Sequence, residues 1–237
     1  MLRYILPFLA FATIAQAQAP TSNASVMVAH VENEQIFASN NVNRQVSADL
    51  AGRLAFSLLT QEWIRIFEVD LTQNMNTPDG TLSLEDASRL MLLDGREGDI
   101  ARTSVARLIG YTPKTLQETI LKLFDDMHIE TTNMAVERSS YGGPQWSGTI
   151  RVSDIGRLGI ALEKLHGDTL GLIAAGSGLQ CLTYQEDTHN GGTLISLVTG
   201  AASSEGCLAA AQQAISLTFT RFETTPNILS ERTALPE

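Results

Sequence analysis

Lysine is scarce in this sequence, and its distribution excludes one kind of catalytic site. The 237 residues contain only three lysines, Lys114, Lys122 and Lys164. The residues three positions before them are, in the same order, Tyr111, Thr119 and Ala161. No serine therefore stands one helical turn before a lysine, and a serine nucleophile that passes its proton to such a lysine is excluded.

Positive charge as a whole is in short supply. The chain has 16 Lys and Arg against 26 Asp and Glu, which gives a formal net charge of −10 at pH 7. An acidic surface argues against nucleic acid or an anionic lipid surface as the main partner. Neither cysteine has a second Cys or a His at the spacing of metal ligands, so no metal site and no cofactor are expected.

Long apolar runs are absent after the first residues of the chain. Arg3, the apolar run 4–14 and the small residues of Ala15-Gln16-Ala17 have the layout of a secretory signal peptide. We assign residues 1–19 to it and favour cleavage after Ala17 over cleavage after Ala19. A retained anchor is the alternative, but the run is shorter than the roughly 20 residues of a membrane-spanning helix. The sequence predicts a periplasmic or secreted protein with no membrane span after cleavage.

Cysteine is also rare, with only Cys181 and Cys207 present. In an exported protein the two thiols meet oxidising conditions, which favours a disulfide between them. Closing a loop of this length stabilises a fold by about 3.5 kcal/mol on the chain-entropy estimate. The alternative is a pair of small buried thiols.

One stretch, residues 45–60, has the pattern of a buried core helix. Leu50, Leu54 and Leu58 recur at the i, i+4, i+8 spacing of one helical face. Ser47 is suited to cap the start of this helix, and Asp49 puts a carboxylate in its first turn, where the helix dipole favours it. The next segment, 63–71, is expected to be partly extended.

The remaining pattern predicts an α/β protein of the α+β type. Residues 24–39 read as a β-hairpin, and residues 179–198 read as a second hairpin followed by a helix at 207–217. Between them the pattern is mostly helical, with Ser83 and Thr112 as helix caps and a loop at 139–148. We therefore expect a single domain over residues 20–237. It would have one antiparallel sheet built from the two ends of the chain and an inserted helical lobe at about 81–166.

Several local strings, in this order, resemble the serine D-alanyl-D-alanine carboxypeptidases of the penicillin-recognising, β-lactamase-like superfamily. In that family an aliphatic-aromatic pair and an Asn-containing loop precede a Pro-Ala-Ser-x-Thr-Lys helix start. The matching strings here are Ile36-Phe37, Asn40-Asn41, Ser47-Ala48-Asp49-Leu50-Ala51-Gly52, the segments 83–97 and 124–133, and the run 192–200. The resemblance covers nearly the whole chain after the signal peptide and implies the fold of that superfamily.

The resemblance also implies where catalytic residues should stand, and the required types are missing there. The nucleophilic serine of the family's Ser-x-x-Lys corresponds to Asp49, and the lysine corresponds to Gly52. The Ser-x-Asn turn corresponds to Gly95-Arg96-Glu97, and the Lys-Thr-Gly strand to Ala174-Ala175-Gly176. A shift by one residue would put Arg53 at the lysine position, but an arginine stays protonated and is no base.

These observations leave three hypotheses for function. The leading one is an exported, catalytically inactive D-alanyl-D-alanine carboxypeptidase-like protein that binds peptidoglycan or a cell-wall peptide, or acts there as a scaffold. The second is an active serine-type hydrolase whose residues are misassigned, and the third is a secreted protein that binds a small ligand. Asp49, Asp94 and Glu97 could also converge for acid-base work or a divalent ion, although carboxylates near helix starts usually act as caps.

Overall fold

The central element of the fold is a five-stranded antiparallel sheet that both ends of the chain build. The computed structural model describes residues 24–166, 173–176, 180–187, 191–201 and 203–224, so the predicted signal peptide lies outside the described residues. The strand order is β2-β1-β10-β9-β8. The bounds are Ser25–His30 for β1, Ile36–Asn40 for β2, Ile173–Gly176 for β8, Gln180–Glu186 for β9 and Thr193–Thr199 for β10.

Both faces of this sheet are covered, which explains why its central strands are almost entirely buried. Helix α6 (Ser204–Thr224) covers one face, where Val28, Leu194 and Ile215 pack together. On the other face, Ile195 and Leu197 join the main hydrophobic core with the helices that follow β2. Alternate residues of β10 thus enter two different cores, and every residue of the strand is buried.

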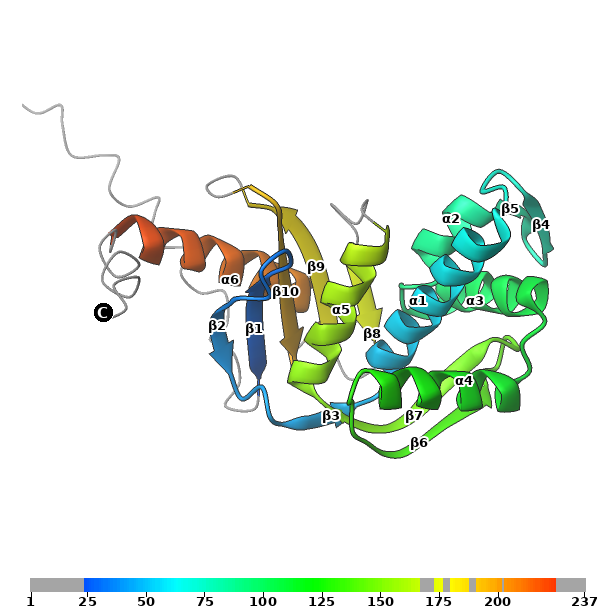
Figure 1. The fold of residues 1–237 in the computed structure, drawn as a ribbon, viewed down its shortest axis with the longest axis horizontal. Coiled ribbons are helices and arrows are strands. Elements are labelled where there is room, and N and C mark those ends of the chain that lie inside the picture. The colour runs from blue at the N-terminus through cyan, green and yellow to red at the C-terminus, as the bar shows by residue number, and fades with distance from the viewer. Residues whose placement is uncertain (1–23, 167–172, 177–179, 188–190, 202, 225–237) are drawn as a thin grey trace, which may run out of the picture.

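The helices between the two ends of the sheet form a second lobe, of which α5 lies over the other face of the sheet and α2, α3 and α4 lie beside it (Figure 1). They are α1 (Asp49–Phe67), α2 (Leu84–Leu90), α3 (Gly95–Ile109), α4 (Pro113–Asp126) and α5 (Val152–His166). Helix α1 packs against α5 and also contacts α3, α4 and β8. The N-terminal half of α1 therefore lies between the sheet and the helical lobe, and its residues 49–58 are all buried. The α+β class and the antiparallel sheet built from both termini are confirmed.

The helical lobe also contains short strands that the sequence pattern did not predict. A three-stranded sheet has the order β3-β7-β6, and a separate hairpin joins β4 to β5. Their bounds are Gln45–Ser47 for β3, Asn74–Thr77 for β4, Gly80–Ser83 for β5, Thr131–Arg138 for β6 and Pro144–Arg151 for β7. The predicted loop at 139–148 is wrong from Pro144 onward, since that residue begins β7.

Two predictions about the core helix need correction. It begins at Asp49, because Gln45–Ser47 pairs with β7 as a strand, and Ser47 lies before the first helical turn. It also continues into the segment 63–71, expected to be partly extended, and ends at Phe67, with Glu68 as its C-cap in the left-handed conformation. A helix that has already formed is extended at little cost, and this outweighs the local preference of aromatic and β-branched residues for strands.

The predicted helix ends that depend on local chemistry are confirmed. The Ser83 hydroxyl accepts the N–H of Asp86 at the start of α2, and Thr112 forms a capping box with Thr115 ahead of Pro113. Gly110 closes α3 with a positive φ of 87°, a conformation that glycine adopts without strain. These caps need only neighbours in sequence, which is why the pattern predicts them.

The predicted disulfide is present between Cys181 on β9 and Cys207 on α6. The two Cα atoms are 6.0 Å apart. Both residues are buried beside Val198 and Ala211, in the small core between α6 and the sheet. The bridge therefore fastens the last helix to the centre of the sheet.

Candidate functional site

The start of α1 is held in place by the small sheet of the helical lobe. The Ala48 N–H donates to the carbonyl of Gly148, 3.0 Å away, and the Ser47 hydroxyl accepts the N–H of Asp49 at 3.3 Å. The predicted cap at Ser47 is one residue out of place, because Ala48 occupies the cap position and no side chain there makes a capping hydrogen bond; Ser47 accepts the N–H of the first helical residue. These contacts place the Asp49 side chain at the junction between the two lobes.

Asp49 lies in a buried charge cluster centred on Arg53. The Arg53 Nη2 is 2.7 Å from Asp49 Oδ2 and 2.8 Å from Asp94 Oδ1, and its Nη1 donates to the carbonyl of Ala175 at 2.6 Å. Arg53 is 4% exposed and Asp49 is 2% exposed, whereas the Asp94 side chain is 59% exposed. One guanidinium therefore ties together α1, the start of α3 and the edge strand β8.

The edge strand β8 is closed at Ala175 by the helical lobe. Its carbonyl accepts from Arg53, and its N–H donates to the carbonyl of Leu92 at 3.0 Å. The next residue, Gly176, is so close to α1 that an added Cβ would lie 2.7 Å from the Cβ of Leu50. Both main-chain hydrogen-bonding groups of Ala175 are thus engaged, and at this residue the edge offers nothing to an added extended chain.

The position one turn after Asp49 has no room for a side chain. A Cβ built on Gly52 would lie 2.1 Å from Cγ of Trp146 and 2.3 Å from its Cδ2. Trp146 comes from β7, is 4% exposed and packs against Phe56 with ring centroids 6.2 Å apart. The indole ring occupies the space into which any side chain at position 52 would extend.

A second buried pair lies behind this cluster on α3. Arg102 donates to the carbonyls of Met91 and Leu93 at 2.9 and 2.8 Å, and Asp99 accepts a short hydrogen bond from the Ser139 hydroxyl. Burial, followed by the nearby positive charge of Arg53, lowers the pKa of Arg102 to about 10. The carbonyls and carboxylates around Arg102 compensate for burying its charge and fix the segment between α2 and α3.

The structure brings some of the predicted site residues together and leaves others apart. Asp49 and Asp94 converge on Arg53, and Gly52 contacts Trp146. Gly95 begins α3 with a φ of 83°, Glu97 lies in the exposed first turn of that helix, and Ala174 is buried in β8. Among the described residues, no group of three His, Cys, Asp or Glu side chains is arranged to hold a metal ion.

Sequence reasoning missed the roles of two residues that organise this site. The family frame presents Arg53 only as a displaced base, although its i, i+4 spacing from Asp49 is a signal for an ion pair. Trp146 falls in the segment predicted to be a loop, and no local pattern relates it to Gly52. The carbonyl of Ala175 is a main-chain group, so side-chain motifs carry no information about it.

No protein-family model matches the sequence, and no curated protein matches it either. Solved structures do match. Penicillin-binding protein D2 from Listeria monocytogenes, in its ampicillin-bound form, is similar with a TM-score of 0.61 and 14% identity, over 82% of this chain and 96% of that one. The chain has the penicillin-binding-protein fold.

Two further structures agree with this assignment of the fold. A peptidoglycan synthesis regulatory factor from Streptococcus pneumoniae is similar with a TM-score of 0.64 and 11% identity, over 83% of this chain and 78% of that one. The D-alanyl-D-alanine carboxypeptidase of Francisella tularensis has a TM-score of 0.58 and 10% identity, over 83% and 69%. At these identities the penicillin-binding-protein fold is shared, and activity has to be judged from this chain's own side chains.

Within the described part of the chain, every helix is too short or too polar to cross a membrane.

Proposed function

We propose that this chain is an exported, cell-wall-associated binding or scaffolding protein with a penicillin-binding-protein fold and without acyl-transfer activity. In the frame that the sequence resemblance implies, Asp49 stands at the position of the nucleophilic serine and Gly52 at that of the lysine. Gly95-Arg96-Glu97 and Ala174-Ala175-Gly176 stand at the other two motifs. The proposal combines this frame with the side chains that surround those positions.

The contact between Gly52 and Trp146 carries the proposal. Acyl transfer by a serine needs a neighbouring group that takes the hydroxyl proton, and here the neighbouring position has neither a side chain nor space for one. The nucleophile position carries a carboxylate whose charge is already compensated by Arg53 at 2.7 Å. The position of the Trp146 ring therefore supports the proposal that the lysine of the family frame is lost at position 52 and that the ring fills its space.

The closed edge of β8 supports the same proposal. An extended peptide binds a sheet edge through the free N–H and carbonyl groups of that edge. At Ala175 both groups are bonded within the protein, and Arg53 and Asp94 cross the junction between the lobes. A substrate peptide would have to break these contacts before it could lie along β8.

A location and a partner class follow as parts of the proposal. The signal-peptide pattern and the Cys181–Cys207 disulfide favour an oxidising compartment outside the cytoplasm. Two of the similar structures are named as a peptidoglycan synthesis regulatory factor and a D-alanyl-D-alanine carboxypeptidase. Peptidoglycan, or a peptide derived from it, is therefore the partner that we propose.

The first experiment tests the absence of acyl transfer. The purified chain is incubated with a fluorescent penicillin, and D-alanine release is measured from a pentapeptide that ends in D-alanyl-D-alanine. We expect neither a covalent adduct nor D-alanine release, while an active penicillin-binding protein run in parallel gives both. A stoichiometric adduct would overturn the proposal. Turnover that disappears in Asp49→Ala would instead establish the misassigned hydrolase.

A second experiment tests the proposed partner. The same protein is mixed with insoluble peptidoglycan sacculi and centrifuged, and the bound fraction is compared with that of an unrelated acidic protein of similar size. We expect this chain to sediment with the sacculi and the control protein to stay in solution. Equal amounts of both proteins in the pellet would contradict a role at the cell wall.

A further inference from the structure

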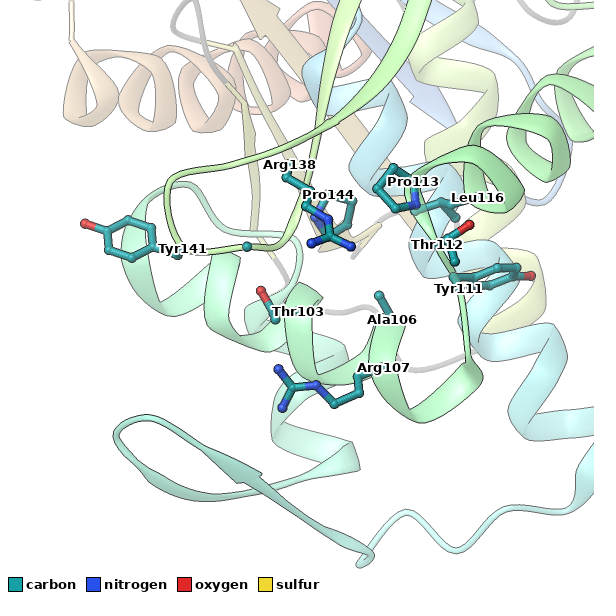
Figure 2. A pocket seen from close by; sticks show the side chains of 11 residues that line it. Thr103, Ala106, Arg107, Tyr111, Thr112, Pro113, Leu116, Arg138, Tyr141 and Pro144 are labelled. Atoms are coloured by element: carbon teal, nitrogen blue, oxygen red, sulfur yellow. The ribbon is translucent and has the colours of Figure 1, made fainter.

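A pocket lies in the helical lobe, separate from the junction between the lobes. Its volume is about 320 Å³, near the lower end of the range for small-molecule sites. It lies between α3, the start of α4 and the turn that joins β6 to β7 (Figure 2). The residues at the junction between the lobes do not line it, namely Asp49, Gly52, Arg53, Asp94 and Ala175. The pocket is therefore separate from that junction.

Two arginines without ion-pair partners line this pocket. Carboxylates lie within 4.0 Å of most other described arginines, namely Arg53, Arg65, Arg89, Arg96, Arg102, Arg151 and Arg157. Among the arginines whose side chains the structure describes, this leaves Arg44, Arg107 and Arg138, and the last two belong to the pocket. In a chain with a net charge of −10, two unpaired guanidinium groups at one pocket are a local reversal of the overall charge.

The two threonines of the pocket are engaged in hydrogen bonds, whereas its two guanidinium groups are not. The hydroxyl of Thr103 already donates to the carbonyl of Asp99 at 2.7 Å, and Thr112 is engaged in the capping box of α4. The guanidinium groups of Arg107 and Arg138 have no acceptor among the described residues. Figure 2 shows Arg138 pointing into the middle of the pocket, whereas Arg107 runs along α3 away from it, at the edge of the pocket. A ligand that complements this wall has to bring acceptors, and an oxyanion group is the acceptor that arginine binds best.

The rest of the lining is apolar and aromatic. Ala106 of α3, Leu116 of α4 and Pro144 of β7 contribute aliphatic surface, and Tyr111 contributes a ring at one side. Leu116 and Pro144 are buried, so this part of the wall belongs to a packed core. A free inorganic ion would leave the apolar surface in water, and a ligand with a short apolar part would cover it.

We propose that this pocket binds a small ligand that carries one oxyanion group, a carboxylate or a phosphate, attached to a short apolar portion. Arg138 binds the oxyanion, Arg107 adds positive charge at the edge of the pocket, and the wall formed by Ala106, Leu116 and Pro144 contacts the apolar portion. The site is independent of the proposed function, because it uses no residue of the junction between the lobes and requires no chemistry there.

The test uses three probes with the full processed chain in isothermal titration calorimetry. They are N-acetyl-alanyl-alanine, the same dipeptide with a C-terminal amide, and phenyl phosphate. We expect saturable binding of at least one of the two anions and none of the amide. If only the dipeptide acid binds, the pocket recognises a peptide carboxylate. If only phenyl phosphate binds, it recognises a phosphate. If both bind, it recognises the oxyanion whatever its source.

Matched variants locate the site. Arg138→Gln should weaken binding by about tenfold or more, since it removes a charge-assisted hydrogen bond. Arg107→Gln should weaken binding less, since it removes only a nearby positive charge. Arg44→Gln removes the same charge from another exposed arginine without an ion pair and should leave affinity unchanged. Ala106→Leu fills the pocket without a change of charge and should also weaken binding. The absence of saturable binding for both anions, or an equal loss in Arg44→Gln, would overturn the proposal whatever the penicillin experiment gives.

Discussion

The indole of Trp146 lies where a side chain at position 52 would have to be, with its Cγ only 2.1 Å from a Cβ built on Gly52. The two residues are far apart in the chain, one in α1 and one in β7, yet each determines which residue fits at the other position. The pair packs the first turns of α1 against the three-stranded sheet β3-β7-β6. A lysine introduced at position 52 would require the tryptophan to be removed first.

The first prediction follows from this contact. Gly52→Ala should lower the free energy of unfolding by about 1–3 kcal/mol, because the new methyl group must displace a packed ring. Urea unfolding measures the change. Gly206→Ala is the matched helical control, since its Cβ would meet only the Ser203 hydroxyl oxygen at 3.0 Å. That variant should be neutral or stabilised by up to about 1 kcal/mol through the higher helix propensity of alanine.

A double-mutant cycle separates this contact from other effects at position 52. Trp146→Ala alone should cost about 3–5 kcal/mol, because it empties a buried site. In that background the cost of Gly52→Ala should largely disappear, since the ring is no longer there to be displaced. An undiminished cost of Gly52→Ala in the absence of the ring would show that something other than Trp146 excludes a side chain.

The second prediction concerns the buried ion pair. Arg53→Met should destabilise the protein by about 3–5 kcal/mol, because Asp49 would stay buried without its partner. The loss should be smaller in an Asp49→Asn background, where no buried charge is left uncompensated. Thermal and urea unfolding of the two single variants and the double variant measure this.

The same helix provides the control for that prediction. Arg65 pairs with Glu62 at 2.5 Å, but both side chains are largely exposed. Arg65→Met should therefore change stability by less than about 1 kcal/mol. Equal losses in Arg53→Met and Arg65→Met would contradict the role assigned to the Arg53 cluster.

Whether the sequence predicts a feature of this molecule depends on how far apart in the chain its interacting residues are. Leu50, Leu54 and Leu58 identify α1 because its buried face repeats within a few residues. The Arg53 cluster is not predictable in this way, since its partners Asp94 and Ala175 are 41 and 122 residues away. The same reason applies to Trp146 at the candidate site, because only the assembled lobes bring β7 against α1.

The disulfide gives the third prediction. Reduction, or Cys207→Ala, should lower the free energy of unfolding by about 3.5 kcal/mol, because the bridge between residues 26 positions apart no longer restricts the unfolded chain. Chemical denaturation with and without reductant measures the change. Reductant should have no further effect on the Cys207→Ala variant, which serves as the control. Alkylation of both cysteines in the unreduced, folded protein would contradict the bridge.

The fourth prediction is a pH dependence at Asp94. Partial burial acts to raise the pKa of Asp94, but the hydrogen bond and charge of Arg53, with the N–H of Gly95 and the charge of Arg102, outweigh it and hold the pKa below its ordinary value. A carboxyl group with a lowered folded-state pKa stabilises the fold above its unfolded pKa of about 3.9, and this contribution is lost as the pH falls through the folded pKa.

Asp94→Asn should therefore remove part of the acid-induced loss of stability and leave the remainder. The effect should stay below about 1 kcal/mol, because the Asp94 side chain is 59% exposed and solvent screens the pair. Urea unfolding midpoints at a series of pH values from about 2 to 6 measure it. Asp126→Asn removes an exposed carboxylate from α4 and controls for the change in net charge. If the two variants shift the profile equally, the contact between Asp94 and Arg53 contributes nothing to acid stability.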